Sequence, residues 1–177
     1  LTSQVTLEAW IKITSNQDGT IISRNGPFFL AVRNNKVHGG VHTSGGEEGW
    51  TEIDGISNLE LNKWYHLAMI YDGFQVRVFV DGILENSASK SGIMEIRSQA
   101  PFIGWGEPGQ NQYFDGVIDE VRISDIARTS FDIAPPEPQV NLTELKNNLN
   151  NRVNNLELQV LELQNQTRED QQRISIL

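Results

Sequence analysis

The sequence predicts an all-β jelly-roll sandwich of two antiparallel sheets, followed by a C-terminal α-helical coiled-coil stalk. Two observations predict this combination. All 15 Gly and every aromatic residue (4 Trp, 3 Tyr and 7 Phe) of the 177-residue chain lie at or before Phe131. From Val140 onward the hydrophobic pattern has a heptad period instead of a period of two. We therefore predict a β domain at 1–131, a Pro-rich linker at 132–139 and an oligomerisation helix at 140–177.

Strands are expected where apolar and polar residues alternate. Residues 5–13 alternate over nine positions, and two Asp-Gly pairs bracket residues 74–80, which predicts a meander that begins with 64–71. Further strands are expected at 20–24, 28–33, 36–43, 50–53, 92–97, 101–104 and 116–124. Many short strands with Gly and Asn between them favour a two-sheet sandwich, with a closed barrel as the alternative.

Composition excludes several classes of function. The absence of Cys excludes a disulfide scaffold, a thiol nucleophile and a Cys-ligated metal. A net charge of −9 argues against a nucleic-acid partner, which needs a basic face. No apolar run approaches the length of a membrane helix, so we expect no membrane insertion in this segment. The chain starts at Leu1 within a strand pattern and without Met, so we expect a processed or excised piece.

Three motifs in the β domain carry a family resemblance. In chain order they are VTLEAWIK, then WYHLAMIYDG with VRVFVDGIL, and finally YFDGVIDEVRIS. They resemble the laminin-G-like branch of the concanavalin A-like lectin/glucanase superfamily, over nearly all of 1–131. The resemblance implies two curved antiparallel sheets and a role as an extracellular binding or adhesion module. It also implies an additional strand before Val5, but almost no residues precede Val5. Either that strand has been removed or another chain segment completes the sheet.

No catalytic residues are expected. Glycoside hydrolases of this superfamily place carboxylates in an E-x-D-x-x-E pattern, because retaining catalysis needs two of them close together. The nearest match starts at Glu52 and Asp54 but has Ser57 at the third position, so we interpret it as an Asp-Gly turn preceded by an exposed Glu. His38 and His42 are too far apart along a strand to share a metal unaided, and are expected to line the concave sheet.

Asp119 is the candidate metal ligand. Strand alternation places it on the face of Val117 and Val121, among core residues, where a carboxylate must be bonded or paired. The resemblance implies that such an Asp ligates a structural Ca²⁺. The alternative is that Asp119 accepts backbone N–H bonds from a neighbouring loop.

Two loops have the composition of a sugar-binding site, in which aromatic rings stack on the sugar and polar groups bind its hydroxyls. The candidates for ligand binding are Trp50, Glu48, Trp105, Asn111, Gln112 and Tyr113. The alternative for Trp50 and Trp105 is that they begin or end strands and cap the core.

The stalk is predicted to be a parallel homodimer or homotrimer. Its apolar residues occupy the a and d positions of one heptad frame: Leu142, Leu149, Val153, Leu156, Val160, Leu163, Ile174 and Leu177. Lys146, Thr167 and Asp170 interrupt this frame, and polar residues at such positions help to set register and partner number. The heptads continue to Leu177, so we expect a longer natural stalk.

Two N-x-T triplets are candidate glycosylation sites, at Asn141 and Asn165, both outside the a and d positions.

These features support three hypotheses of function. The first is a non-enzymatic adhesion module that binds a glycan or a surface protein with several heads at once, located extracellularly, at a cell surface or at a virion surface. The second is a structural subunit of a surface layer, filament or virion fibre without a soluble ligand. The third and least favoured is a glycoside hydrolase.

Overall fold

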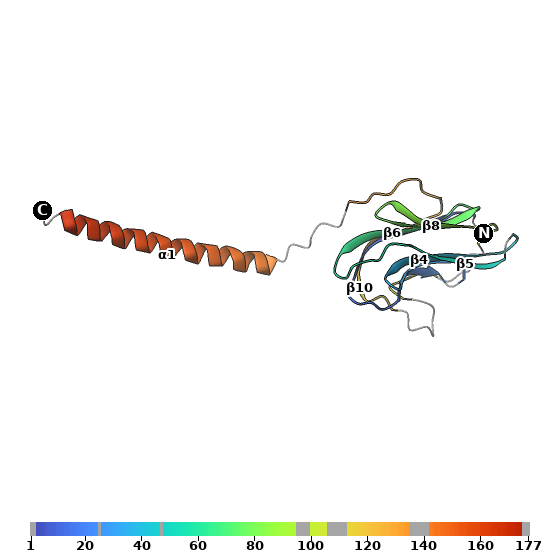
Figure 1. Ribbon diagram of the computed structural model, residues 1–177, viewed down its shortest axis with the longest axis horizontal. Coiled ribbons are helices and arrows are strands. Elements are labelled where there is room, and N and C mark those ends of the chain that lie inside the picture. Colours follow the sequence, from blue (N-terminus) through green and yellow to red (C-terminus); the bar gives the residue numbers. More distant parts are fainter. Residues whose placement is uncertain are drawn as a thin grey trace. The chain divides into compact units, whose positions relative to one another are not determined.

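The computed structural model describes residues 3–24, 26–46, 48–94, 100–105, 113–134 and 142–174. The chain divides into two compact units, Leu1–Pro136 and Glu137–Leu177. The first holds the strands and the second holds helix α1, Leu142–Ile174 (Figure 1).

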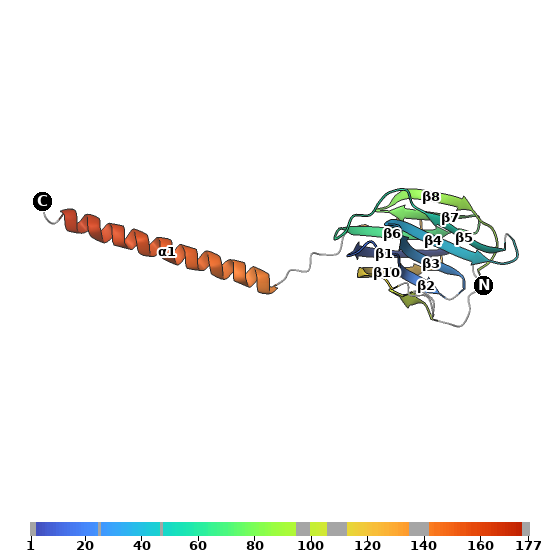
Figure 2. The same cartoon turned by 60° about the horizontal axis from the view of Figure 1, so that its bottom comes forward.

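The β unit is a sandwich of two five-stranded antiparallel sheets, as the sequence predicts (Figure 2). Sheet I has the strand order β10-β1-β6-β7-β8 and sheet II has the order β5-β4-β3-β2-β9. The strands of sheet I are β1 (Val5–Ile13), β6 (Trp64–Tyr71), β7 (Gln75–Val80), β8 (Ile83–Ser89) and β10 (Gly116–Ser124). Those of sheet II are β2 (Gly19–Arg24), β3 (Phe28–Arg33), β4 (Lys36–Thr43), β5 (Gly49–Asp54) and β9 (Phe102–Ile103).

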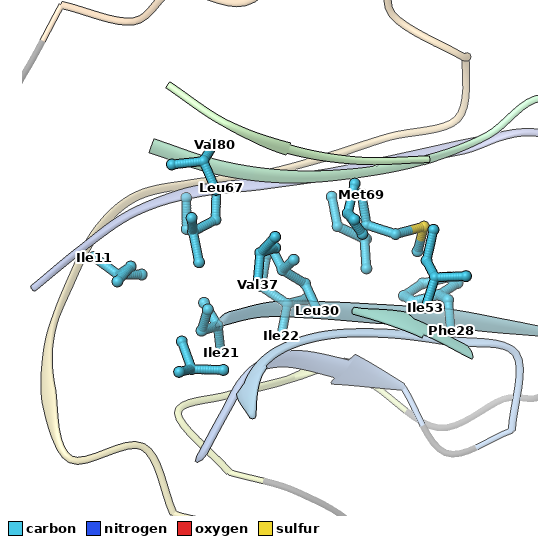
Figure 3. Packing of buried hydrophobic residues seen from close by; sticks show 14 of the residues in the cluster. Ile11, Ile21, Ile22, Phe28, Leu30, Val37, Ile53, Leu67, Met69 and Val80 are labelled. Atoms are coloured by element: carbon cyan, nitrogen blue, oxygen red, sulfur yellow. The ribbon is translucent and has the colours of Figure 1, made fainter. Parts of the chain in front are cut away.

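Alternation along the strands builds the core between the sheets. Leu67 and Met69 of sheet I face Leu30 and Val37 of sheet II, and all four side chains are buried (Figure 3). Because successive side chains of a strand point to opposite faces, the residues between these core positions lie on the outer faces of the sandwich.

Tight turns join β6, β7 and β8 in the predicted meander. Asp72 Oδ1 accepts 2.9 Å bonds from the backbone N–H groups of Phe74 and Gln75, and Gly73 has a φ of 94°. Asp81 and Gly82 have φ values of 49° and 76°, which a two-residue turn between antiparallel strands requires. Both Asp-Gly pairs therefore form the turns that the sequence predicts.

Two strands differ from the sequence prediction. β8 was not predicted, because its residues show no apolar alternation and lie mostly exposed at the edge of sheet I. The strand expected at 92–97 appears in the described residues as an isolated antiparallel bridge between Ile93 and Ser44, and residues 95–99 lie outside the described part of the chain.

A bulge in β10 places Asp119 on the outer face of sheet I, so its prediction as a core-face residue is wrong. The register advances by two residues on β1, from Glu8 to Trp10, but by three on β10, from Arg122 to Asp119. Glu120 is the extra residue and has a φ of 48°. The bulge shifts the alternation, so Asp119 pairs with Trp10 on the outer face.

Residues 125–134, here called the strap, cross the outer face of sheet I. Thr6 Oγ1 on β1 accepts a 3.0 Å bond from the Arg128 backbone N–H. Farther along the strap, the Phe131 ring lies 5.2 Å from that of Phe79 on β7, between ring centroids. The strap therefore spans from β1 to β7 and covers side chains that would otherwise be exposed.

A buried ion cluster lies beneath the strap. The Glu8 side chain is 3% exposed, and its Oε1 lies 3.4 Å from Arg122 Nη1 and 3.3 Å from Arg128 Nε. Its Oε2 lies 3.3 Å from His66 Nε2. Burial lowers the pKa of His66, against the opposing effect of Glu8. The cluster satisfies a carboxylate that burial would otherwise penalise heavily.

Candidate functional site

The outer face of sheet II carries the candidate site. On β3, Phe28, Leu30 and Val32 face the core, so Phe29 and Arg33 face outward. The register pairs His42 with Trp50, Gly40 with Glu52, and His38 with Asp54. Directly paired residues share a face of an antiparallel sheet, so β4 and β5 place these six side-chain positions together.

An aromatic group occupies the β5 side of this face, and we call it the first aromatic group. The centroid of the Phe29 ring lies 5.5 Å from that of Trp50 and 4.9 Å from that of His38. The His42 ring meets Trp50 edge to face at 5.5 Å. Trp50 is supported on two sides and yet remains 43% exposed. An indole ring that neighbouring side chains hold in place but leave accessible is well placed to stack on a ligand.

Gly40 lets this group pack closely. A Cβ atom at Gly40 would lie 2.9 Å from Phe29 Cε1, 2.9 Å from the Thr51 carbonyl oxygen and 3.1 Å from Glu52 Cγ. Any side chain here would displace the Phe29 ring or Glu52. Glycine thus permits the close approach of β3 and β5 side chains over β4.

Charged side chains next to the aromatic group hold each other in place. Arg33 donates to both oxygens of Asp54, from Nε at 3.1 Å and from Nη2 at 2.6 Å. Arg33 Nη1 also lies 3.5 Å from Glu52 Oε2. The hydrogen bond from Arg33 lowers the pKa of Asp54, so this carboxyl group is ionised at neutral pH.

His38 is neutral in this setting. Burial, with the Arg33 charge, lowers the pKa of His38. Its Nδ1 lies 2.9 Å from Asp54 Oδ1 and 3.2 Å from the Ile53 carbonyl oxygen, so Nδ1 carries the proton and donates. Nε2 is then an acceptor, 3.6 Å from Glu52 Oε2. This end of the face therefore offers acceptors beside the partly exposed guanidinium group of Arg33.

A hollow of about 280 Å³ connects these groups across four strands. It extends from β5 over β4 and β3 to β2 and to the turn before it. Its lining includes Asp18, Thr20, Ser23, Arg24, Phe29, Ala31, Arg33, His38, Trp50 and Glu52.

The second aromatic group lies at the β9 edge of the same sheet. The rings of Trp105 and Tyr113 stack in parallel, with 6.2 Å between centroids, and Phe102 meets Trp105 edge to face at 5.0 Å. Ser23 Oγ donates a 3.0 Å bond to the Trp105 carbonyl oxygen. The bond attaches this group to β2, at the end of the hollow.

Most of the described candidates from the sequence fall into these two groups. His38, His42 and Trp50 belong to the first aromatic group, and Trp105 and Tyr113 belong to the second. Glu48 is exposed beside β5. Asn111 and Gln112 lie outside the described residues.

Sequence reasoning missed Phe29, Arg33 and the role of Asp54. The alternation of β3 could have identified Phe29 and Arg33 as outward-facing residues. Glu52 is half-exposed as expected, but both it and Asp54 belong to β5 and face Arg33. At the third position of the hydrolase pattern, Ser57 Oγ donates a 2.8 Å bond to Glu85.

Asp119 lies apart from this site, on sheet I. Its Oδ1 accepts a 2.8 Å bond from the backbone N–H of Glu120, the next residue. Among the described residues there is no group of three or more His, Asp or Glu placed to hold a metal ion. Calcium binding at Asp119 stays a prediction.

Helix α1 presents the predicted apolar stripe. Leu149, Val153, Leu156, Val160 and Leu163 are all exposed in the single chain. Leu142 and Ile174 are the two ends of the helix, and Leu177 lies outside the described residues. Of the glycosylation candidates, Asn165 is exposed on the helix and Asn141 lies outside the described part.

Comparison with known proteins agrees with this architecture. A model of the concanavalin A-like lectin/glucanases superfamily, in its laminin G form, matches residues 1–134. The chain belongs to this superfamily. The superfamily contains both lectins and glucanases by name, and its laminin G and lectin domains are typically extracellular.

Curated protein sequences provide no match. In the described part of the chain, α1 lacks an apolar stretch of the length that a bilayer crossing needs.

Solved structures share the fold of this superfamily member at low identity. The chain is similar to a protein from Bacteroides ovatus, with 24% identity, a TM-score of 0.59, and coverage of 72% of this chain and 38% of that one. It is similar to domains LG4-5 of the mouse laminin α1 chain, with 15% identity, a TM-score of 0.59, and coverage of 72% and 37%. It is also similar to the CBM40 domain of the Ruminococcus gnavus IT-sialidase bound to α2,3-sialyllactose, with 18% identity, a TM-score of 0.57, and coverage of 72% and 79%. Two of these three structures are more than twice as long as the region that they share with this chain.

Proposed function

We propose that the chain is a non-enzymatic, extracellular glycan-binding module that its C-terminal helix assembles into a homo-oligomer. The observation that carries the glycan proposal is Trp50, held by Phe29 and His42 but 43% exposed, beside the carboxylates of Glu52 and Asp54. An accessible indole next to fixed acceptors suits a sugar, whose ring has an apolar C–H face and a hydroxyl-rich edge.

Fixed polar groups favour sugar binding over binding of a flat protein surface. Arg33 holds both Asp54 oxygens, so those groups lose little conformational freedom when a ligand arrives. The hollow of about 280 Å³ is close to the lower end of the range for small-molecule sites. Both features support recognition of a compact polar ligand on the outer face of sheet II.

The direct test of glycan binding is the Trp50→Ala variant on a glycan array. We expect the wild-type oligomer to bind a subset of glycans, and Trp50→Ala to lose that binding without a change in melting temperature. Phe74→Ala is the matched control, because Phe74 is 80% exposed in the turn between β6 and β7 of sheet I. A wild-type protein that binds no glycan, or equal binding by Trp50→Ala, would contradict the proposal.

The same experiments distinguish the rival functions. A structural subunit without a soluble ligand would bind no glycan and would form ordered arrays visible by electron microscopy. A glycoside hydrolase would release reducing sugar from the glycans that it binds. We expect no release, because Arg33 engages Asp54 and the third carboxylate of the hydrolase pattern is replaced by Ser57.

The occupant proposed for the apolar stripe of α1 is a second copy of the same helix in parallel orientation. In the heptad frame Arg152 occupies position g and Glu157 position e of the next heptad. In a parallel coiled coil these two positions face each other across adjacent chains, so each chain supplies both partners of the ion pair. In an antiparallel pair g faces g, and the g positions of the frame hold Leu, Arg and Gln but no acidic residue to pair with Arg152.

Oligomerisation is tested in the full chain with two double variants. Val153→Glu with Leu156→Glu places charge at a and d, whereas the control, Asn154→Glu with Asn155→Glu, places it at b and c. We expect only the first to reduce the mass in light scattering to that of a monomer. The same double variant should also bind a glycan-coated surface about a hundredfold more weakly, because it presents one head instead of several. A monomeric wild-type protein would contradict the proposal.

A further inference from the structure

Two aromatic groups lie on one face of sheet II, at opposite edges. The first group includes Trp50 on β5, and the second consists of Phe102, Trp105 and Tyr113 at β9. Phe102 pairs with Ser23 on β2, and Ser23 pairs with Phe29 on β3. Because directly paired residues share a face, Phe102 projects from the same face as the first group.

The hollow lies between the first group and β2, the strand next to the second group. The hollow passes from Glu52 on β5 to Ser23 on β2, and short side chains such as Thr20 and Ala31 line it along the way. Thr20 and Ala31 are register partners on β2 and β3. The hydrogen bond from Ser23 to the Trp105 carbonyl oxygen connects this surface to the second group. Short side chains leave room for a ligand to lie across the strands.

The separation of the groups sets the size of that ligand. From β5 to β9 the sheet order contains four strand spacings, which amounts to ~19 Å. One unit of an extended pyranose chain is about as long as one strand spacing of ~4.8 Å. A single sugar therefore reaches one aromatic group, whereas a chain of about four or more units reaches both.

Charges along the hollow define the chemical class. The lining residues include two carboxylates, Asp18 and Glu52, and two guanidinium groups, Arg24 and Arg33. Asp54, which binds Arg33, adds a third carboxylate beside them. No excess of positive charge is present to hold an anionic sugar. Carboxylate acceptors bind the hydroxyl donors of a neutral sugar and repel a carboxylate or sulfate.

We propose that the site takes an extended, uncharged oligosaccharide of about four or more units, lying across the strands with a ring stacked at each aromatic group. This inference rests on the proposed glycan-binding function and specifies its ligand. It differs from recognition of a single terminal sugar, for which the second aromatic group would be unnecessary.

The test uses the intact oligomer and defined polysaccharides. Affinity electrophoresis compares four neutral probes (xylan, mannan, mixed-linkage β-glucan and galactan) with heparin and polygalacturonate, and calorimetry measures binding of the trisaccharide sialyllactose. Calorimetry then follows size-defined oligomers of the best neutral probe. We expect retardation by a neutral polysaccharide, and affinity that rises with chain length and reaches a plateau once both aromatic groups are occupied.

Variants at the second group separate a chain from a single sugar. Trp105→Ala and Tyr113→Ala should each weaken binding of the long oligomer by about tenfold, the loss of one ring stack. Neither should change binding of the disaccharide if that ligand stacks on Trp50. Tyr113 is exposed, so its replacement leaves the fold intact, and Phe74→Ala is again the control.

Each outcome has a distinct meaning. Affinity that is independent of length, or full binding by both Trp105→Ala and Tyr113→Ala, would overturn the extended chain while leaving glycan binding in place. Preference for heparin, polygalacturonate or sialyllactose would overturn the uncharged class. Binding to none of the probes, neutral or anionic, would contradict the proposed function itself.

Discussion

Arg128 on the strap holds the buried carboxylate of Glu8 on β1, with 3.3 Å between Nε and Oε1. The two residues are 120 positions apart in the sequence. Glu8 is 3% exposed, and Arg122 and His66 also approach it. The segment that leads out of the β domain is therefore attached to its first strand through ion pairs with a buried carboxylate.

Replacing Glu8 with Gln should lower the free energy of unfolding by about 3 kcal/mol, because Arg122 and Arg128 would remain half-buried without an anion. Denaturation of the full chain in urea, followed by tryptophan fluorescence, measures the loss. Glu60→Gln is the control, because Glu60 is 73% exposed and its pair with Lys63 is worth little. Equal stability of the two variants would show that the cluster contributes nothing.

Phe131→Ala should destabilise the β domain by about 2 kcal/mol, less than the loss at a fully buried Phe. The ring contacts His66 at 5.3 Å and Phe79 at 5.2 Å, between centroids, so its removal exposes both. Phe74→Ala removes an exposed ring and should cost less than ~0.5 kcal/mol. If the two variants unfold at the same urea concentration, the strap does not stabilise the sheet.

Stability should fall as the solution is acidified below about pH 6.5, the usual pKa of His in an unfolded chain. Burial lowers the pKa of both His38 and His66 in the folded state. Between each lowered pKa and about 6.5 the unfolded chain binds more protons, so the free energy of unfolding rises with pH in this window. Besides Glu8, the charges that face His66 are Asp81 and Arg122.

Asp54 contributes to the pH dependence of stability in a separate, more acidic pH range. Its pKa is lowered by the hydrogen bond from Arg33, so its stabilisation is present above about pH 4 and is lost as pH falls through the lowered folded pKa. Urea titrations across pH measure both windows. His38→Gln should reduce the slope in the histidine window and leave the acidic loss in place. An unchanged slope would contradict the assignment to His38.

The sequence predicts strands well where one face is buried and poorly where neither is. β1 and the β6–β7 hairpin alternate because one side of each contacts the core. β8 is an exposed edge strand, so its sequence bears no such pattern. Asp119 was assigned to the wrong face because a bulge depends on how β10 pairs with β1, and alternation assumes that no bulge is present.

The residues of the candidate site were also only partly predictable from the sequence. His42 and Trp50 could be proposed from residue type, since both flank a Gly-rich loop. The pair formed by Arg33 and Asp54 could not, because it joins β3 to β5 across the intervening β4. Contacts of that kind follow from strand order, which local patterns do not encode.

Charge exchange between Arg152 and Glu157 tests the parallel orientation proposed for α1. Arg152→Glu alone, or Glu157→Arg alone, places like charges at facing g and e positions and should weaken the oligomer by about 0.5–1 kcal/mol per pair. The double variant restores opposite charges and should recover the wild-type melting temperature of the helix, measured by circular dichroism at constant protein concentration. Added salt should shrink the difference, because the pairs are exposed. An antiparallel arrangement predicts no such recovery, because g then faces g and e faces e. A double variant that is as weak as the single variants would therefore contradict the parallel coiled coil.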